Sequence, residues 1–136
     1  MLKRTLTLVC LLILLAPAIK AEENECKSFY QGQTFTVNQL KIILESPEKK
    51  AEAEINLCGT TLHGLNLSGW DLSHINLLGS DLGETILQNT NFSQANLTKT
   101  YFASADLTQA NLQKAQLENA RLENAKLTNA DLRQAN

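Results

Sequence analysis

The chain is poor in the residues on which several classes of protein depend. Three cysteines, two histidines, two prolines and one tryptophan occur among its 136 residues, and aromatic side chains make up 5%. Three cysteines are too few for a disulfide-rich miniprotein, and two histidines exclude a histidine-rich metal centre. The 14 acidic and 12 basic residues give a formal charge of −2. The chain therefore lacks the basic excess that binds nucleic acids, and its length suits one ordinary domain.

The first 21 residues have the composition of a secretory signal peptide. Lys3 and Arg4 precede an uncharged apolar run, and small residues follow it up to Ala21, after which we expect cleavage. The apolar stretch over residues 5–19 would reach about 22 Å as a helix, short of the ~30 Å of a bilayer core. A retained membrane anchor is the alternative. We predict an exported protein, periplasmic or secreted, with no stable membrane anchor after cleavage.

A period of five residues runs from position 57 to position 132. Every fifth residue of this segment is leucine or phenylalanine, without interruption. Two residues before each of them stands a second, smaller column, which is serine, threonine or alanine from position 80 onward. We call these the leucine column and the small column. The predicted core is the leucine column: Leu57, Leu62, Leu67, Leu72, Leu77, Leu82, Leu87, Phe92, Leu97, Phe102, Leu107, Leu112, Leu117, Leu122, Leu127 and Leu132.

A spacing of five fits neither a helix nor a single strand. Five residues advance a helix by about 500°, which would scatter the leucines around it. In one continuous strand, an odd spacing would place successive leucines on opposite faces. Each quintet must therefore contain its own corner. Coils of such quintets, stacked about 4.8 Å apart, would bury both columns in a narrow interior, so the pattern predicts an all-β solenoid.

The quintets ANLTK at 95–99 and ADLTQ at 105–109 resemble those of the pentapeptide-repeat family. The resemblance covers residues 55–136. It implies a right-handed quadrilateral β-helix with four quintets per coil, and hence about four coils in this segment. The four-sided shape is an implication of the resemblance, because the spacing alone does not determine it.

A short helix is predicted near residues 37–45, inside an N-terminal capping segment over residues 22–54. Thr36 and Gln39 have the spacing of a capping box, apolar residues share one helical face, and Pro47 ends the helix. Large residues occupy the small column only in the first coil or just beyond, Trp70 among them. We therefore expect the helix to cover a widened first coil and its open β edge. A ligand pocket around Trp70 is the alternative.

Cys26 and Cys58 are the two cysteines of the predicted mature chain. In an exported protein they should form a disulfide that ties the segment before the helix to the first coil. Such a bond would contribute about 3–4 kcal/mol in the chain-entropy model. Two free thiols are the alternative.

No residue set for catalysis or for a cofactor emerges. The sequence contains no nucleophile–histidine–acid signature, Walker loop or GxGxxG motif. Cys58, His63 and His74 would point outward from three different faces under the four-sided register, which argues against a metal site. We therefore predict a protein that is not an enzyme and that takes no cofactor, metal or small-molecule substrate.

The preferred function is a non-catalytic structural or protein-interaction module whose flat polar faces bind a protein partner that the sequence does not identify. One face would stack four amides: Asn56, Asn76, Asn96 and Gln116. The alternative is a DNA-mimic regulator of a topoisomerase, as in the acidic quinolone-resistance members of the family. The export signal and the near-neutral repeat region argue against that alternative. An enzyme or an accessory domain of one is a weaker rival.

The quintet pattern continues to the last residues of the sequence, with no capping segment after it. The final coil would therefore present an unpaired β edge and the ends of the leucine column. We expect a homodimer through this C-terminal coil, with a frayed monomer and a truncated fragment as alternatives.

Overall fold

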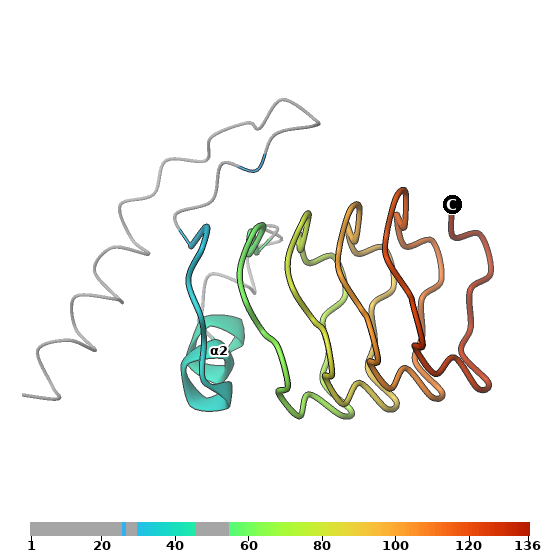
Figure 1. Ribbon diagram of the computed structural model, residues 1–136, viewed down its shortest axis with the longest axis horizontal. Coiled ribbons are helices and arrows are strands. Elements are labelled where there is room, and N and C mark those ends of the chain that lie inside the picture. The colour runs from blue at the N-terminus through green and yellow to red at the C-terminus, as the bar shows by residue number, and fades with distance from the viewer. Residues whose placement is uncertain (1–25, 27–29, 46–54) are drawn as a thin grey trace, which may run out of the picture.

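The computed structural model describes residues 26, 30–45 and 55–136. Helix α2 (Val37–Leu44) stands at one end of a row of open coils, and the chain runs along this row to the other end (Figure 1). The predicted signal peptide and much of the predicted capping segment lie outside the described residues. Within the part of the chain that is described, no helix has the length and apolar character needed to cross a bilayer.

The coils contain twenty residues each and pair through single parallel bridges. Asn56 bridges Asn76, Asn76 bridges Asn96, and Asn96 bridges Gln116, and the other sides of the coil follow the same interval. An interval of four quintets means that the coil has four sides, as the family resemblance implies. Over residues 55–136 the pairing consists of isolated bridges, and no continuous strand forms. The reason is local: a corner follows after every two or three extended residues, so no longer strand can form.

Each corner is a tight turn with one residue in the left-handed region. In the turn from Phe92 to Ala95, the Ala95 N–H donates to the Phe92 carbonyl at 3.0 Å. The second residue after each member of the leucine column from Leu57 to Leu132 has a positive φ, between 55° and 73°. Gly59 adopts it without a Cβ penalty, whereas Asn89 and most later corners adopt it with a side chain.

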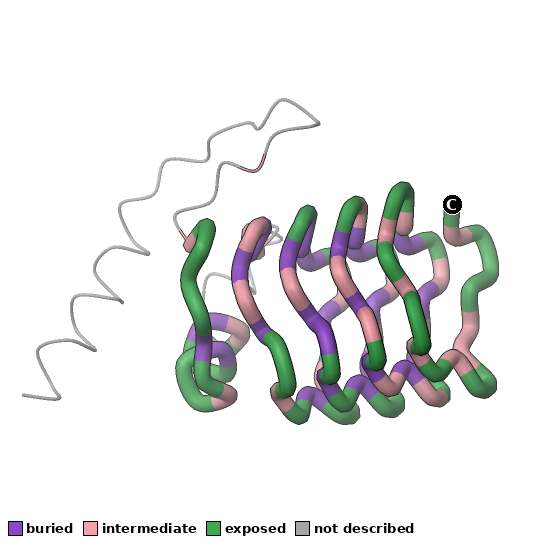
Figure 2. The backbone as a smooth tube through the Cα atoms, in the orientation of Figure 1, coloured by how far each residue is buried: buried purple, intermediate pink, exposed green. Residues whose placement is uncertain are grey.

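The leucine column forms the core over most of its length. The twelve members from Leu57 to Leu112 are at most 1% exposed, and buried residues recur along the successive coils in Figure 2. The rings of Phe92 and Phe102 meet edge to face at 6.2 Å. Of the last four members, Leu117, Leu122 and Leu127 are half-buried and pack against this core, and Leu132 is 40% exposed. The described chain packs no later coil onto these four residues, so their outer sides meet solvent.

The small column buries hydroxyl groups without leaving them unpaired. Thr60, Ser80, Thr90 and Thr100 are at most 1% exposed. The Thr100 Oγ1 donates to the Leu77 carbonyl at 2.8 Å, and the Thr90 Oγ1 donates to the Leu67 carbonyl at 2.9 Å. Each hydroxyl therefore bridges two coils inside the core. A buried hydroxyl with a partner avoids the cost of desolvation, which is why the narrow interior accepts threonine beside alanine.

Helix α2 begins at the predicted capping box. The Thr36 Oγ1 accepts from the Gln39 N–H at 3.4 Å, and the Thr36 N–H donates to the Gln39 Oε1 at 3.0 Å. Leu40 and Ile43 are buried in the same core cluster as the first leucines of the repeats. The helix therefore covers the open interior of the first coil, as the sequence predicts.

The β edge of the first coil is closed by the chain before the helix, and not by the helix itself. Thr34 forms a parallel bridge with Thr61, the Thr61 N–H donates to the Gln33 carbonyl at 2.8 Å, and the Phe35 N–H donates to the Thr61 carbonyl at 3.3 Å. We expected the helix to satisfy this edge. A helix cannot do so, because its own backbone groups are already paired internally.

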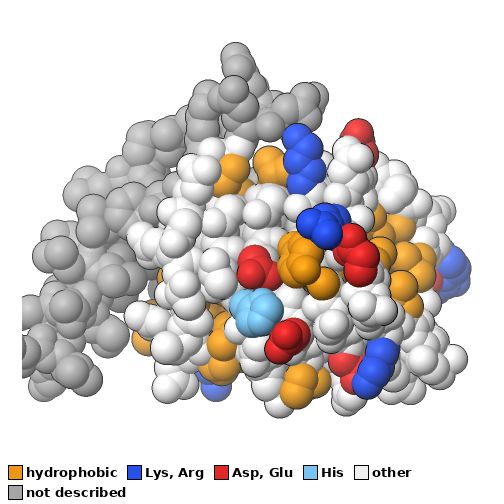
Figure 3. Space-filling view, viewed as in Figure 1, with side chains coloured by type: hydrophobic (Ala, Val, Ile, Leu, Met, Phe, Trp, Pro, Cys, Tyr) orange, Lys and Arg blue, Asp and Glu red, His pale blue; other side chains and the backbone are white. Residues whose placement is uncertain are grey.

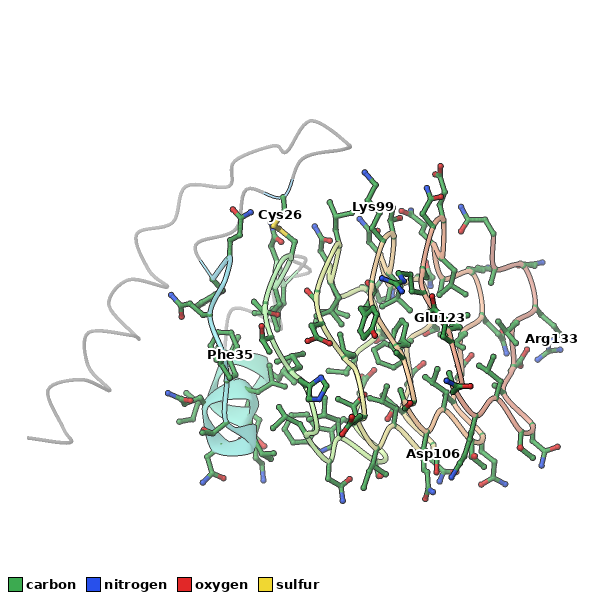
Figure 4. All side chains as sticks on the ribbon, in the orientation of Figure 1. Cys26, Phe35, Lys99, Asp106, Glu123 and Arg133 are labelled. Carbon is green, nitrogen blue, oxygen red and sulfur yellow. A yellow bond between two sulfur atoms is a disulfide. The ribbon has the colours of Figure 1, made fainter. Side chains whose placement is uncertain are left out.

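Cys26 and Cys58 form a disulfide with their Cα atoms 5.6 Å apart, which fits the predicted pairing (Figure 4). The bond connects the segment before α2 to the first quintet of the coil. The disulfide lies beside a backbone hydrogen bond in which the Gly32 N–H donates to the Gly59 carbonyl at 2.7 Å. The N-terminal cap is thus attached to the repeats by a covalent bond, by backbone pairing and by apolar packing.

Candidate interaction faces of the solenoid

The four sides of the coil form four faces, which we name after one residue of each. On every face the outward positions are the residue before a leucine-column member and the two residues after it. The Asn96 face consists of residues 55–59, 75–79, 95–99 and 115–119, and the Tyr101 face consists of residues 60–64, 80–84, 100–104 and 120–124. The Asp106 face consists of residues 65–69, 85–89, 105–109 and 125–129, and the Asn111 face consists of residues 70–74, 90–94, 110–114 and 130–134.

The Asn96 face carries the predicted amide stack. The bridges place Asn56, Asn76, Asn96 and Gln116 above one another in successive coils. The hydrogen bonds of Asn76 and Asn96 run within their own quintets, because each Oδ1 accepts from the N–H two residues later at 3.1 Å. These asparagines therefore shape the corners of the coil.

A ladder of side-chain bonds between coils lies on the Asn111 face. The Asn111 Nδ2 donates to the Asn91 Oδ1 at 3.1 Å, and the Asn91 Nδ2 donates to the Asp71 Oδ1 at 2.9 Å. Sequence reasoning missed this ladder. Its signal is the amide or carboxylate that recurs every twenty residues from Asp71 to Asp131. An asparagine amide can donate to the side chain in one neighbouring coil and accept from the side chain in the other, so such a column connects successive coils.

Arg133 holds Asp131 at the end of the same face. Its Nε lies 2.9 Å from Oδ1 and its Nη2 lies 2.7 Å from Oδ2, which is a bidentate contact (Figure 4). These bonds hold the pKa of Asp131 well below its ordinary value, and they raise the pKa of Arg133. Gln113 adds a bond to Asp131 from the coil before.

The Asp106 face combines a bonded carboxylate with an exposed apolar side chain. The Thr108 side chain bonds to Asp106, and the Gln88 Nε2 donates to its Oδ2 at 2.8 Å. These bonds, that from Thr108 first, lower the pKa of Asp106. Ile86 stands one coil earlier in the same outward column and is 41% exposed.

The Tyr101 face carries two outward ring-bearing side chains, His63 and Tyr101, together with four charged ones: Asp81, Glu84, Arg121 and Glu123. His63 lies between two carboxylates, with Nδ1 3.5 Å from the Asp81 Oδ1 and Nε2 3.8 Å from the Glu84 Oε2. Farther along, the Arg121 guanidinium lies 4.9 Å from the centre of the Tyr101 ring. Figure 3 shows histidine, acidic, basic and hydrophobic side chains close together on one face of the solenoid.

The residues considered for a metal site do not converge. Cys58 lies on the Asn96 face in a disulfide, His63 lies on the Tyr101 face, and His74 lies on the Asn111 face. Over the described ranges, no group of three or more histidine, cysteine, aspartate or glutamate side chains has the geometry to hold a metal ion. No metal ligands can therefore be assigned.

Trp70 packs against the core from the small column. It is half-buried beside the hydrophobic cluster, and it borders a shallow hollow against the end of α2. Lys41 and Glu45 form an exposed ion pair of 3.7 Å on the other side of this hollow. The packing explains a large residue at this position, since the first coil must meet a helix and not another coil.

Comparison with known proteins identifies the repeats. The family model for pentapeptide repeats matches residues 75–113 and 100–136, with eight copies. Among curated proteins, none matches the chain.

Three solved structures illustrate the similarity. QnrB1, a plasmid-mediated fluoroquinolone resistance protein, is 20% identical with a TM-score of 0.50 over 61% of this chain and 48% of its own. HetL of the cyanobacterium Nostoc, which is involved in heterocyst differentiation regulation, is 27% identical with a TM-score of 0.39, and the match covers 61% of this chain and 51% of HetL. A protein of the Arabidopsis thaliana thylakoid lumen is 35% identical with a TM-score of 0.28 over 54% of each chain.

The chain spans about half the length of these structures. The likeness to QnrB1 concerns the fold alone, and that fold is the right-handed quadrilateral β-helix.

Proposed function

We propose that the chain is an exported, non-catalytic module of the pentapeptide-repeat family, whose model matches residues 75–136, and that it binds a protein through the flat faces of its solenoid. Proteins of this family are generally structural or interaction proteins without catalytic activity. The observation that carries the proposal is the fixed register of the outward side chains. Bridges every twenty residues and the corner bonds fix the backbone that carries these side chains before any partner arrives, so binding would cost little ordering of the backbone.

The experiment is capture of a partner by the mature chain. The chain from Glu22 onward, immobilised and cross-linked to envelope or secreted proteins of its source, should retain one partner in a defined ratio. The purified pair should then bind in calorimetry. A Leu97→Asp variant serves as the control, because a charge in the core should unfold the coil and abolish specific capture. Equal capture by both proteins, or no partner for the folded chain, would contradict the proposal.

Export rests on the sequence of residues 1–21 and is supported by the Cys26–Cys58 disulfide, since such bonds persist in oxidising compartments. We expect the intact mass of the exported product to lack the signal segment and to begin near Glu22. A membrane-bound product that retains Met1 would favour an anchor instead.

DNA mimicry is the second candidate, and the likeness in fold to QnrB1 is what keeps it open. It requires aligned, uncompensated acidic side chains. Asp131 is held by Arg133, Asp106 accepts from Gln88, and the two lie on different faces, which favours protein binding of another kind. Inhibition of a topoisomerase by the purified mature chain would restore this alternative.

A further inference from the structure

We infer that the Tyr101 face is the surface through which the module binds, and that its partner presents a lysine or arginine side chain to Asp81 and Glu84. This inference rests on the proposed function and names the surface that carries it out. The binding surface consists of six residues: His63, Asp81, Glu84, Tyr101, Arg121 and Glu123.

The first observation is a preorganised pair of the residue types that dominate protein interfaces. Tyr101 is the only tyrosine in residues 55–136, and it stands in an outward column. Arg121 lies over its ring at 4.9 Å, and the Arg121 Nε donates to the Glu123 Oε1 at 3.0 Å. Tyrosine and arginine are enriched among binding hot spots. Here both are already held by contacts within the face, which lowers the entropy cost of binding.

The second observation is the shape of the face between these groups. In the column after the leucines, Gly83 and Ala103 separate His63 from Glu123. A Cβ on Gly83 would lie 2.8 Å from the His63 Nδ1, so the imidazole leans over the glycine backbone toward the next coil. The imidazole therefore fills the space above Gly83, while Ala103 presents only a methyl group in the quintet that holds Tyr101. The aliphatic stem of a lysine or arginine side chain can pack beside this methyl group and the ring.

The third observation is the charge beside Tyr101. Residues 55–98 contain Asp71, Asp81 and Glu84 but no lysine or arginine. Among the described residues, His63 is the only basic group within ion-pair distance of Asp81 or Glu84. The side chains of Asp81 and Glu84 are 40% and 72% exposed. The surface therefore offers two accessible carboxylates next to an aromatic ring, which is complementary to a basic side chain.

The other faces do not combine these properties. The Asn111 face uses its amides and carboxylates in a ladder between coils, and its Asp131 is occupied by Arg133. On the Asp106 face the carboxylate accepts from Gln88 and Ile86 stands alone as an exposed apolar residue. The Tyr101 face is thus the one where an aromatic ring and accessible carboxylates come together.

The test uses two acetylated heptapeptides, one of alternating serine and lysine and the other of alternating serine and glutamate. The ¹⁵N-labelled mature chain should show amide shifts with the lysine peptide in residues 60–64, 80–84 and 100–104, and none with the glutamate peptide. Asp81→Asn together with Glu84→Gln should weaken lysine-peptide binding about three- to tenfold. Tyr101→Ser should weaken it to a similar extent. Glu118→Gln, which removes a carboxylate from the Asn96 face, is the matched control and should leave binding unchanged.

Two outcomes would overturn the inference. One is the absence of binding by the lysine peptide, and the other is a set of shifts spread over all four faces and insensitive to the Asp81 and Glu84 substitutions. The inference and the proposed function fail separately. A captured protein partner whose affinity is unchanged by Asp81→Asn, Glu84→Gln and Tyr101→Ser would refute this face and leave the module as a binding protein. Failure of the folded chain to capture any partner would refute the function itself.

Discussion

At the scale of the residue, position within the quintet decides what a side chain does. Leu97 is fully buried, whereas Thr98, one residue later, is half-buried at the corner and its N–H bonds to Asn96. The same residue type can also differ between coils. Leu97 and Leu132 occupy the same column, but Leu132 is 40% exposed. Burial therefore depends both on the column and on the coils to either side.

This contrast gives a prediction for two leucine-to-alanine substitutions. Leu97→Ala should lower the free energy of unfolding by about 2–5 kcal/mol, because it removes buried methyl groups and leaves a cavity. Leu132→Ala should lower it by less than about 1 kcal/mol, because much of that side chain is already in water. Urea denaturation of both variants provides the measurement. Equal losses would show that the two coils are packed alike.

A second prediction concerns acid. The pKa values of Asp106 and Asp131 are lower in the folded chain than the ordinary value of about 3.9. Their ionised forms therefore stabilise the fold above about pH 4, and this contribution is lost as the pH falls through the folded pKa. The urea midpoint of the wild-type protein should drop in this acidic range. Asp131→Asn should show a smaller drop, and a drop equal to that of the wild type would exclude Asp131 as a source of acid sensitivity.

At the scale of the element, the N-terminal cap has three parts with different tasks. Residues 32–35 pair with the edge of the first coil, α2 covers its apolar interior, and the Cys26–Cys58 disulfide holds the cap in place. The backbone pairing and the disulfide join the cap to the first coil, at Cys58, Gly59 and Thr61. A solenoid whose coils contact only their neighbours should therefore respond to damage of the cap locally.

Cys26→Ser tests this local response. Loss of the disulfide should lower the stability of the cap and first coil by about 3–4 kcal/mol, because the reduced chain gains conformational freedom when unfolded. Hydrogen exchange should speed up at Thr61 and Leu62 while the amides of Phe102 and Leu107 keep their protection. Thr36→Ala is the milder companion, with an expected cost of about 1 kcal/mol from the lost helix cap. Uniform acceleration along the whole solenoid would contradict local behaviour.

The sequence predicted the features that repeat and missed those that depend on neighbouring coils. The leucine column, the capping box at Thr36 and the Cys26–Cys58 pair follow from spacing and residue type. The Asp71–Asn91–Asn111 ladder and the threonine hydroxyls that reach the next coil require the twenty-residue register and the direction of each side chain. Pairing of Thr34 with Thr61 was missed because a short segment before a helix carries no periodic signal.

The Tyr101 face was missed for a related reason. His63, Asp81, Tyr101 and Arg121 are about twenty residues apart in sequence, and each occupies an ordinary outward position of its own quintet. In the sequence these four residues lie in four separate quintets with no visible relation to one another. They become one surface only when the coil is closed with four sides.

At the scale of the whole molecule, the two ends of the solenoid differ. The first coil is covered by α2 and residues 32–35, whereas the last described coil exposes Leu132 and leaves Leu122 and Leu127 half-buried (Figure 2). The Asn136 Oδ1 accepts from the Leu117 N–H at 2.7 Å, so a side chain satisfies part of the edge where a further coil would pair. A second copy could cover the remaining apolar surface, because identical edges can meet around a two-fold axis.

The homodimer therefore stays a prediction with a direct test. Light scattering on the mature chain at micromolar concentrations should give twice the monomer mass, and Leu127→Lys should return it to the monomer by placing a charge in the contact. A substitution of Leu78 is not a suitable control for Leu127→Lys, because Leu78 is buried and its loss would affect folding. Glu84→Lys, an exposed change on the Tyr101 face, is the suitable control and should leave the mass unchanged. A monomer that is indifferent to Leu127→Lys would rule out the dimer.

The interval of four quintets means that residues share a face only when they are separated by whole coils of twenty residues. Deleting one quintet between Tyr101 and Arg121 would keep both inner columns intact, so the shortened chain should still fold. Every later quintet would, however, rotate by a quarter turn, and Arg121 would leave the side of the coil that holds Tyr101. Only a deletion or duplication of twenty residues restores the alignment of the faces. Changes in length that preserve a surface should therefore come in whole coils, while changes of a single quintet preserve the fold and scramble the surface.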